Sequence, residues 1–234
     1  PYFYGEIAAN VAQIKNTGLE FLLNVTPFQT DNFEWTANLT YSTNTNEVVS
    51  LSNGEFQLTN DFFDEGYTGE PIQIETHRIQ EGQPIGNFFG LKSVDITEDG
   101  IWVIERPDGT LVPATEATTD DRQVLGNGLP KTYYSWNNTV KYKNWDLMVN
   151  LRGALDYQIL NFSRMFYENP TISYNTLDSA YDMVYGKAVL QDVQRFVSYY
   201  VEDGDFLKID NVTLGYTLPK DAIKFAQSFR IYAS

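Results

Sequence analysis

The stretch GLEFLLNVTPFQTDNFEWTANLTY, residues 18–41, decides the fold of this chain. In its second half, polar side chains alternate with five apolar ones, Phe33, Trp35, Ala37, Leu39 and Tyr41. Because successive side chains of a strand point to opposite faces, this pattern predicts a strand with one apolar and one polar face. The first half shows the same alternation less strictly, and a short turn at residues 27–32 joins the two strands. Such an antiparallel hairpin belongs either to a water-soluble β-sandwich or to a membrane β-barrel.

Similar alternation recurs along the chain and predicts an all-β, antiparallel fold. We expect strands at about 18–26, 33–44, 133–142, 145–153, 206–217 and 228–234, and a further short strand near residues 7–14. Two long loops, about 46–132 and 154–204, separate them. The first is expected to hold little regular structure beyond a small hairpin at residues 100–114 that turns at Pro107-Asp108-Gly109, and the second a helix near residues 177–190.

Two regularities favour the barrel over the sandwich. Short and very long connections alternate, as they do between the periplasmic turns and extracellular loops of outer-membrane barrels. Aromatic residues also gather at the short-turn ends of the strands. Because neighbouring strands run in opposite directions, these residues are predicted to form a membrane-interface belt at one level. Its members are Phe33, Trp35, Tyr142, Trp145, Tyr216 and Phe229.

The composition excludes several classes of function. Of 234 residues, 42% are hydrophobic and 15% aromatic, enough for a core and for aromatic surfaces. A formal charge of −15 argues against nucleic acid as a partner, since phosphates require cations. The chain contains no cysteine, which excludes disulfides and thiolate chemistry, and its single histidine, His77, leaves little room for a histidine-based catalytic or zinc site.

Three blocks carry a resemblance to a known family. They read NTGLEFLLNVTPFQTDNFEWTANLTYSTNTNEVVSL at residues 16–51, GNGLPKTYYSWNNTVKYKNWDLMVNLRGALDYQILN at 126–161 and VEDGDFLKIDNVTLGYTLP at 201–219. Together they resemble the SusC/RagA-type TonB-dependent transporters of Bacteroidetes, and the third block is the most specific. It departs from the usual pattern at Lys208, Ile209 and Asp210, where the family more often has Arg, Leu, and Lys or Arg.

The resemblance implies that residues 1–234 are the C-terminal part of a large plugged barrel, of the 22-stranded class, with the plug domain absent from this chain. It further implies a location in the outer membrane of a Gram-negative bacterium. There the whole protein would import oligosaccharides or peptides together with a SusD-like surface lipoprotein, and TonB would act through a region absent from this chain. The alternative is a soluble extracellular β-sandwich that binds glycans. An enzyme is disfavoured, because no nucleophile and base form a defensible pair and no catalytic residue is predicted.

Loop aromatics are the candidate substrate-binding residues, since aromatic rings stack on sugars and pack on peptide side chains. The strongest candidates are Phe88, Phe89, Trp102, Tyr199 and Tyr200. The alternative role for each is to pack the long loops together.

Acidic side chains of the loops are the only candidates for a bound ion. Glu202, Asp203 and Asp205 are the best calcium ligands by type, because calcium prefers oxygen donors. The group lacks the full ligand pattern of a calcium loop, and solvated loop charge is the favoured interpretation. No other cofactor or metal is predicted.

Overall fold

The computed structural model describes residues 11–219, 222–223 and 226–234. The chain divides into two compact units. We call residues 17–45, 130–156 and 204–234 the sheet unit, and residues 46–129 and 157–203, with the N-terminal residues, the loop unit. The short strand predicted near residues 7–14 lies largely outside the described residues. In the described part of the chain, no helix has the length and apolar character needed to cross a membrane.

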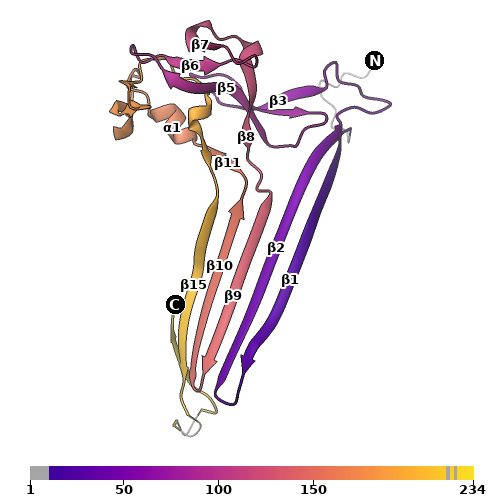
Figure 1. The fold of residues 1–234 in the computed structure, drawn as a ribbon, viewed down its shortest axis with the longest axis vertical. Coiled ribbons are helices and arrows are strands. Elements are labelled where there is room, and N and C mark those ends of the chain that lie inside the picture. Colours follow the sequence, from indigo (N-terminus) through magenta and orange to yellow (C-terminus); the bar gives the residue numbers. More distant parts are fainter. Residues whose placement is uncertain (1–10, 220–221, 224–225) are drawn as a thin grey trace, which may run out of the picture. The chain divides into compact units, whose positions relative to one another are not determined.

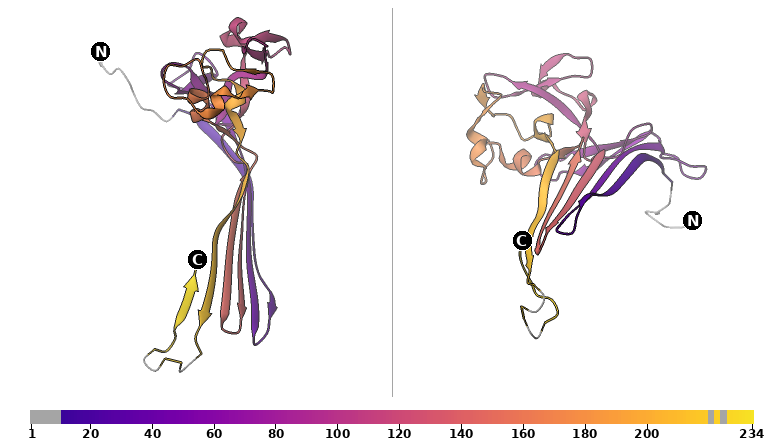
Figure 2. Two further views of the ribbon diagram at one scale, coloured as in Figure 1. Left: turned by 90° about the vertical axis from the view of Figure 1, so that its left-hand side faces the viewer. Right: turned by 60° about the horizontal axis from the view of Figure 1, so that its bottom comes forward.

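The sheet unit is a single sheet of six strands in the order β1-β2-β9-β10-β15-β16 (Figures 1 and 2). The strands are β1 (Gln13–Gln29), β2 (Phe33–Ser50), β9 (Thr132–Tyr142), β10 (Trp145–Leu155), β15 (Phe206–Thr217) and β16 (Arg230–Ala233). Antiparallel pairing places Thr132 opposite both Thr43 and Leu155, so both long connections leave from one end of the sheet. The short turns lie at the other end.

The strand register sorts the side chains into rows that share a face. Phe33 lies opposite Tyr142, Tyr142 opposite Trp145, and Trp145 opposite Tyr216, which makes one aromatic row across four strands. The same face carries Leu147 and Leu214 one step further along. The middle of the opposite face is polar apart from Met148, and one of its rows is made entirely of asparagine: Asn38, Asn137, Asn150 and Asn211.

A β-bulge on β15 preserves this sorting. Leu207 and Ile209 are apolar, and so are Val212 and Leu214, so the alternation slips by one residue between the two pairs. The register shifts at the same place, because Asn150 pairs with Asn211 while Leu151 pairs with Ile209. Asp210 is the extra residue, and its carboxylate lies 2.7 Å from the guanidinium of Arg152. The bulge therefore keeps all four apolar side chains on one face.

One polar residue interrupts the apolar face, and it has a partner. Asn138 lies opposite Ala37 on β2 and Val149 on β10. The indole Nε1–H of Trp35 donates a hydrogen bond of 3.2 Å to the Oδ1 atom of Asn138. The amide oxygen thus has a partner on the same face, which lowers the cost of placing it there.

A bidentate ion pair crosses one strand of the sheet at a glycine. Arg230 of β16 reaches over β15 to Asp146 of β10, with Nε–Oδ1 and Nη2–Oδ2 distances of 2.9 and 2.5 Å. A Cβ atom on Gly215 of β15 would lie 2.3 Å from Nη2 of Arg230. The missing side chain of Gly215 therefore leaves the space through which the guanidinium passes.

The loop unit contains much more regular structure than the sequence analysis expected. Its main sheet has the order β3-β4-β5-β6-β7, with β8 paired to β5. The strands are β3 (Phe62–Tyr67), β4 (Glu75–Gln80), β5 (Asn87–Ile96), β6 (Trp102–Glu105), β7 (Leu111–Pro113) and β8 (Arg122–Asn127). The prediction of a largely irregular first loop is therefore wrong. The sequence did not reveal these strands because they are short and lack sustained alternation. The hairpin at residues 100–114 is confirmed as β6 and β7.

The prediction of a helix near residues 177–190 is also wrong. The structure has a 3-10 helix at Asp178–Tyr181 and a small hairpin of β12 (Met183–Val184) and β13 (Ala188–Val189). The single α-helix of the described residues, α1 (Phe162–Tyr167), is capped by the side chain of Asn161. The remaining elements are β11 (Gln158–Leu160), β14 (Val201–Asp203) and 3-10 helices at Ala114–Glu116, Thr119–Asp121 and Ser198–Tyr200.

The two long connections share one hydrophobic core. Residues of the first connection, such as Ile96 and Trp102, pack in one cluster with Met165, Leu190 and Val197 of the second. Backbone and side-chain hydrogen bonds join the same segments: the Tyr199 amide donates to Ser93 Oγ at 3.0 Å, and the Asn127 amide to Gln158 Oε1 at 2.8 Å. The loop unit is therefore one folded body made from two separate connections.

Candidate functional site

Four of the five predicted substrate-binding aromatics are buried in the interior of the loop unit, and the fifth, Tyr199, is partly buried. Trp102 is 0% exposed, Tyr200 2%, Phe88 5% and Phe89 9%. The ring of Trp102 lies 5.1 Å from that of Tyr199 and 6.0 Å from that of Tyr200. This placement does not support direct stacking of these four buried rings on a substrate. It supports the alternative role, in which they pack the loops together.

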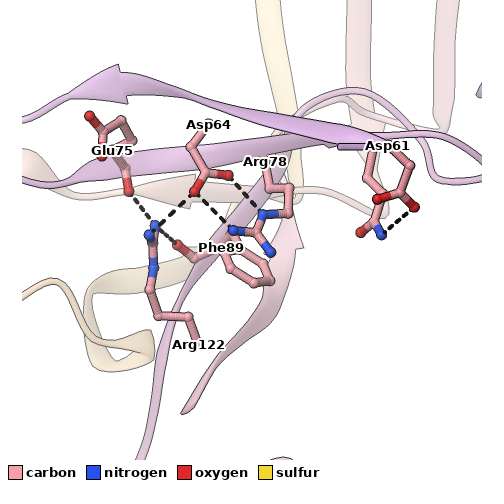
Figure 3. A network of polar contacts seen from close by, with 7 residues as sticks. Asp61, Asp64, Glu75, Arg78, Phe89 and Arg122 are labelled. Carbon is pink, nitrogen blue, oxygen red and sulfur yellow. Dashed lines mark hydrogen bonds and ion pairs between the residues drawn. The ribbon is translucent and has the colours of Figure 1, made fainter. Parts of the chain in front are cut away.

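Phe89 lies within a network of charges in the interior of the same unit (Figure 3). The carboxylate of Asp64 lies 2.7 Å from Arg78 and 3.4 Å from Arg122. Arg122 also donates hydrogen bonds to the carbonyl oxygens of Glu75 and Phe89, at 2.6 and 2.7 Å. The Arg78 guanidinium stacks on the Phe89 ring, 3.7 Å from its centroid. The network holds β3, β4, β5 and β8 together and is structural.

His77 lies beside this network and is half-buried. Its Nδ1 atom is 2.8 Å from Thr76 Oγ1, and its ring lies 4.8 Å from the ring of Phe88. Burial lowers the pKa of His77 below its ordinary value. The imidazole is therefore neutral at pH 7 and packs against Phe88 at the edge of the core.

The loop unit exposes several aromatic residues, and sequence reasoning missed four tyrosines of the second connection among them. These four are 45–65% exposed: Tyr167, Tyr174, Tyr181 and Tyr185. Four tyrosines within nineteen residues, flanked by Asp, Ser and Asn, were a signal that could have found them.

The second connection also encloses a small cavity of about 240 Å³. Its polar lining comes from Arg164 of α1, Glu168 just after it, Ser179 and Asp182, and Met183 lines it too. The ring of Tyr199 lines the cavity as well, with the apolar side chains of Val184 and Leu190 and the buried Tyr200. Sequence reasoning found Tyr199 and Tyr200 but not the polar residues, which are distant from them along the chain.

Arg164 of this cavity is held by two carboxylates. Its guanidinium lies 2.7 Å from Glu168 and 2.5 Å from Glu202, and 4.9 Å from the Tyr199 ring centroid. Burial disfavours the charged form, but hydrogen bonds from the guanidinium to Glu168 and Glu202 outweigh it and raise the pKa of Arg164. The same contact with Arg164 lowers the pKa of Glu202. The three side chains form a fixed, ionised group.

This pairing bears on the calcium prediction. Glu202, the first of the three predicted ligands, is engaged by Arg164 and by the Asn161 amide at 3.2 Å. Within the described ranges, no three histidine, aspartate or glutamate side chains are grouped as metal ligands. Calcium binding by Glu202, Asp203 and Asp205 stays a prediction without support from this geometry.

The predicted interface aromatics lie on the sheet unit, mostly in one row. Tyr142 and Trp145 are about half exposed, at 52% and 49%, and the Trp145 and Tyr216 rings are 4.7 Å apart. Trp35 lies two residues beyond Phe33 on the same face, and the Phe229 carbonyl accepts a hydrogen bond from Leu218 next to β16. The shared level inferred from the sequence is thus present in the strand register.

Relatives of known family match nearly the whole chain. The chain is 26% identical to the TonB-dependent receptor P3 of Formosa agariphila, over 96% of this chain and 24% of that protein. It is 23% identical to the TonB-dependent receptor SusC of Bacteroides thetaiotaomicron, over 92% of this chain and 22% of that protein. The chain therefore spans about a quarter of the length of the relatives that it matches. No protein-family model matches it.

Solved structures give the same answer for the fold. The RagAB peptide importer in its closed-closed state superposes with a TM-score of 0.76 at 20% identity, over 95% of this chain and 25% of that one. Its open-open state gives a TM-score of 0.74 at 18% identity. The resemblance to the SusC/RagA-type TonB-dependent transporters is thereby confirmed, in sequence and in fold, over nearly the whole chain.

Proposed function

We propose that this chain is the C-terminal part of the barrel of an outer-membrane TonB-dependent importer for oligosaccharides or peptides. The observation that carries the proposal is a sheet whose apolar face stays exposed. On that face Leu147 is 37% exposed, and Val212 and Leu214 are each 47% exposed. Facing water, such a continuous apolar surface would be unfavourable, whereas lipid accommodates it.

The spacing of the aromatic residues supports a membrane-spanning role. On β2, eight residues separate Phe33 from Tyr41, which lies opposite Tyr134 of β9. At about 3.3 Å per residue they span about 26 Å along the strand, which a tilt of about 40° reduces to about 20 Å across the membrane. An apolar band about 25 Å tall between two aromatic girdles is typical of outer-membrane barrels. The six aromatics predicted at the interface would form part of the girdle at the short-turn end.

The polar face would then line the lumen, and its side chains suit a hydrated interior. Apart from Met148, uncharged asparagine and threonine side chains occupy its middle. Ion pairs such as Glu34–Lys141 and Asp146–Arg230 lie near the short turns. Such a surface can hydrogen-bond a plug or a polar substrate without a strong field of either sign. In this proposal the chain supplies wall and loops. A plug, a TonB contact and a SusD-like lipoprotein would be supplied by the rest of the protein and its partners.

Lipid exposure of alternate residues on β10 tests the proposal. Because the chain contains no cysteine, single replacements at Leu147, Met148, Val149 and Asn150 can be labelled selectively within it. The full-length protein would carry an environment-sensitive maleimide probe in vesicles that contain nitroxide-labelled lipid. We expect quenching at 147 and 149 but not at 148 and 150, which serve as matched controls. Absence of this alternation, or a protein that stays dispersed without detergent, would instead favour a soluble sandwich.

A further inference from the structure

The chain contains two Asn-Gly dipeptides, and the fold places them in opposite environments. Asn53-Gly54 lies in the first connection between β2 and β3, whereas Asn127-Gly128 lies at the end of β8. In Asn-Gly, the backbone amide of glycine can attack the preceding side chain with little hindrance, because glycine has no Cβ atom. The two dipeptides share this intrinsic chemistry, and the structure around them decides which one reacts.

The reacting groups of the first dipeptide are exposed and have no hydrogen-bond partner. Both Asn53 and Gly54 are exposed. Among the residues that the structure describes, no acceptor bonds the Gly54 amide or Nδ2 of Asn53. A Cβ atom at Gly54 would meet no atom beyond its chain neighbours within 4 Å. The Gly54 nitrogen and the Asn53 carboxamide are thus free to approach each other.

The turn that contains this dipeptide also activates the Asn53 carboxamide. Its Oδ1 atom accepts hydrogen bonds from the Glu55 and Phe56 amides, at 2.9 and 2.8 Å. These bonds hold the carboxamide over the backbone that follows it and polarise its C=O group. Attack on the Cγ atom places negative charge on Oδ1, and the same two amides stabilise it, as backbone donors do in an oxyanion hole.

The second dipeptide is protected at the corresponding atoms. The Gly128 amide donates a hydrogen bond of 2.9 Å to the Gly86 carbonyl oxygen. Nδ2 of Asn127 donates two more, to the Ile85 carbonyl oxygen and to Asn87 Oδ1, both at 2.8 Å. The same reaction at Asn127 therefore requires existing hydrogen bonds to break first.

We propose that Asn53 is a site of spontaneous deamidation and that Asn127 is protected from the same reaction. The Gly54 nitrogen gives its proton to a solvent base and forms a bond to Cγ of Asn53. The Cγ–Nδ2 bond then breaks, and Nδ2 takes up a proton and leaves as ammonia, so that a cyclic succinimide remains. Water adds to either carbonyl carbon of the succinimide and opens the ring to aspartate or isoaspartate. The reaction consumes water and releases ammonia, and it requires no oxidant or reductant.

The main consequence of the reaction is a changed turn. In isoaspartate the chain runs through the former side chain, which adds a methylene group to the backbone and removes the acceptor of the Glu55 and Phe56 amides. The Asn53 amide also donates to the Phe56 carbonyl oxygen at 2.8 Å, and the lengthened backbone disrupts this closure of the turn. The product also adds a carboxylate near Glu55. Deamidation thus alters the first connection as the protein ages, whether or not the import function proposed above is correct.

Peptide mapping by mass spectrometry tests the proposal on the full-length, detergent-solubilised protein incubated at pH 8. We expect aspartate and isoaspartate at position 53 to form at least about tenfold faster than any product at position 127, because the reaction at Asn127 must first break hydrogen bonds. Peptides cut from the same protein before incubation have lost the fold, and in them the two rates should converge. Equal rates in the folded protein, or a difference that persists in the peptides, would overturn the proposal.

Gly54→Ala is the matched variant, because a Cβ atom there contacts nothing and leaves the fold intact. It hinders attack by the backbone nitrogen, so conversion of Asn53 should slow about tenfold or more while Asn127 is unaffected. Thermal unfolding of the variant should match that of the original protein. An unchanged rate at Asn53 in this variant, or formation of aspartate without isoaspartate, would indicate direct hydrolysis and overturn the succinimide route.

Discussion

The sheet unit and the loop unit place the same kinds of side chain in opposite environments. Trp102 of the loop unit is fully buried, whereas Trp136 and Trp145 of the sheet unit are 45% and 49% exposed. Tyr200 and Tyr142 differ in the same way, at 2% and 52%. The loop unit behaves as an ordinary protein whose aromatics make a core. The apolar surface of the sheet unit remains exposed, as expected for a surface whose solvent is lipid.

The charged residues show the same contrast. The Arg122 side chain is 8% exposed and belongs to an interior network, whereas the Arg152 side chain is 55% exposed and its pair with Asp210 lies open on the sheet. Interior pairs are costly to break, while exposed ones contribute little. Substitutions in the two units should therefore differ sharply in effect, and four of them test that expectation.

The largest effect is expected for Trp102→Ala. Truncating a fully buried aromatic side chain removes its burial energy and leaves a cavity, which costs about 3–5 kcal/mol. We expect the loops to become sensitive to limited proteolysis while the sheet unit keeps its strand signal in circular dichroism. Trp136→Ala on the exposed face is the matched control and should leave the loops resistant. Equal protection of the loops in both variants would contradict a core centred on Trp102.

Asp64→Ala should have the next largest effect. It removes the carboxylate shared by Arg78 and Arg122 and leaves two partly buried guanidinium groups unpaired. Because Asp64 and Arg78 are each about one-fifth exposed, we expect about 2–3 kcal/mol of lost stability, less than for a fully buried pair. Chemical denaturation monitored through the loop unit measures it. The control is Glu105→Ala, which removes the exposed ion pair with Lys92 and should cost under about 1 kcal/mol of stability. A similar loss of stability in the Asp64→Ala and Glu105→Ala variants would refute the contrast between interior and exposed ion pairs.

Gly215→Ala tests the ion pair that crosses the sheet. The added Cβ would lie 2.3 Å from Arg230 Nη2 and displace the guanidinium from Asp146. We expect a loss of about 1–2 kcal/mol, seen as a lower temperature at which the barrel unfolds in detergent. Gly54→Ala is the control, because nothing lies within 4 Å of a Cβ there.

Combining Gly215→Ala with Arg230→Ala makes this test more specific. Once the guanidinium is gone, Gly215→Ala should cost less, because two of the three atoms nearest to the new Cβ are absent and the third, Asp146 Oδ1 at 2.6 Å, is no longer held by Arg230. A strictly additive double variant would mean that Gly215 is required by the backbone and not by Arg230.

The smallest effect concerns pH. Burial lowers the pKa of His77 in the folded protein. As the pH falls through the ordinary pKa of 6.5, His77 of the unfolded chain therefore takes up a proton before His77 of the folded chain does. The stability of the loop unit should therefore fall as the pH drops below 6.5, and be unaffected by this group above it. Unfolding measured from pH 8 to pH 5 should show a shallower decline in His77→Phe. An identical slope in both proteins would exclude His77 as a contributor.

Local patterns made the sheet unit predictable. Alternation with a period of two depends only on strand geometry, so it identified the strands, their faces and the aromatic level. Even the bulge at Asp210 has a visible signal, because the apolar phase slips between Ile209 and Val212. The ion pair across Gly215 had no such signal, since it depends on three strands that are far apart in sequence.

The loop unit was less predictable because its core is built from long-range contacts. Trp102 and Ile104 did carry a signal, as two alternate residues of one strand share a face, and both are fully buried. Phe88 and Phe89 defeat that rule: they are adjacent yet both buried, because the register of β5 against β8 shifts between them. The cavity residues Arg164, Asp182 and Tyr199 are brought together only by the folding of the second connection.

The shared core of the two long connections has a consequence for how such proteins can diversify. Residues 46–129 and 157–203 each supply part of one hydrophobic cluster, so neither can be replaced alone without exposing the half that remains. The two connections are therefore expected to evolve together, although β9 and β10 lie between them in the sequence. Recombination between relatives would have to exchange both segments together, while single-residue changes at exposed positions such as Tyr181 leave the shared cluster intact.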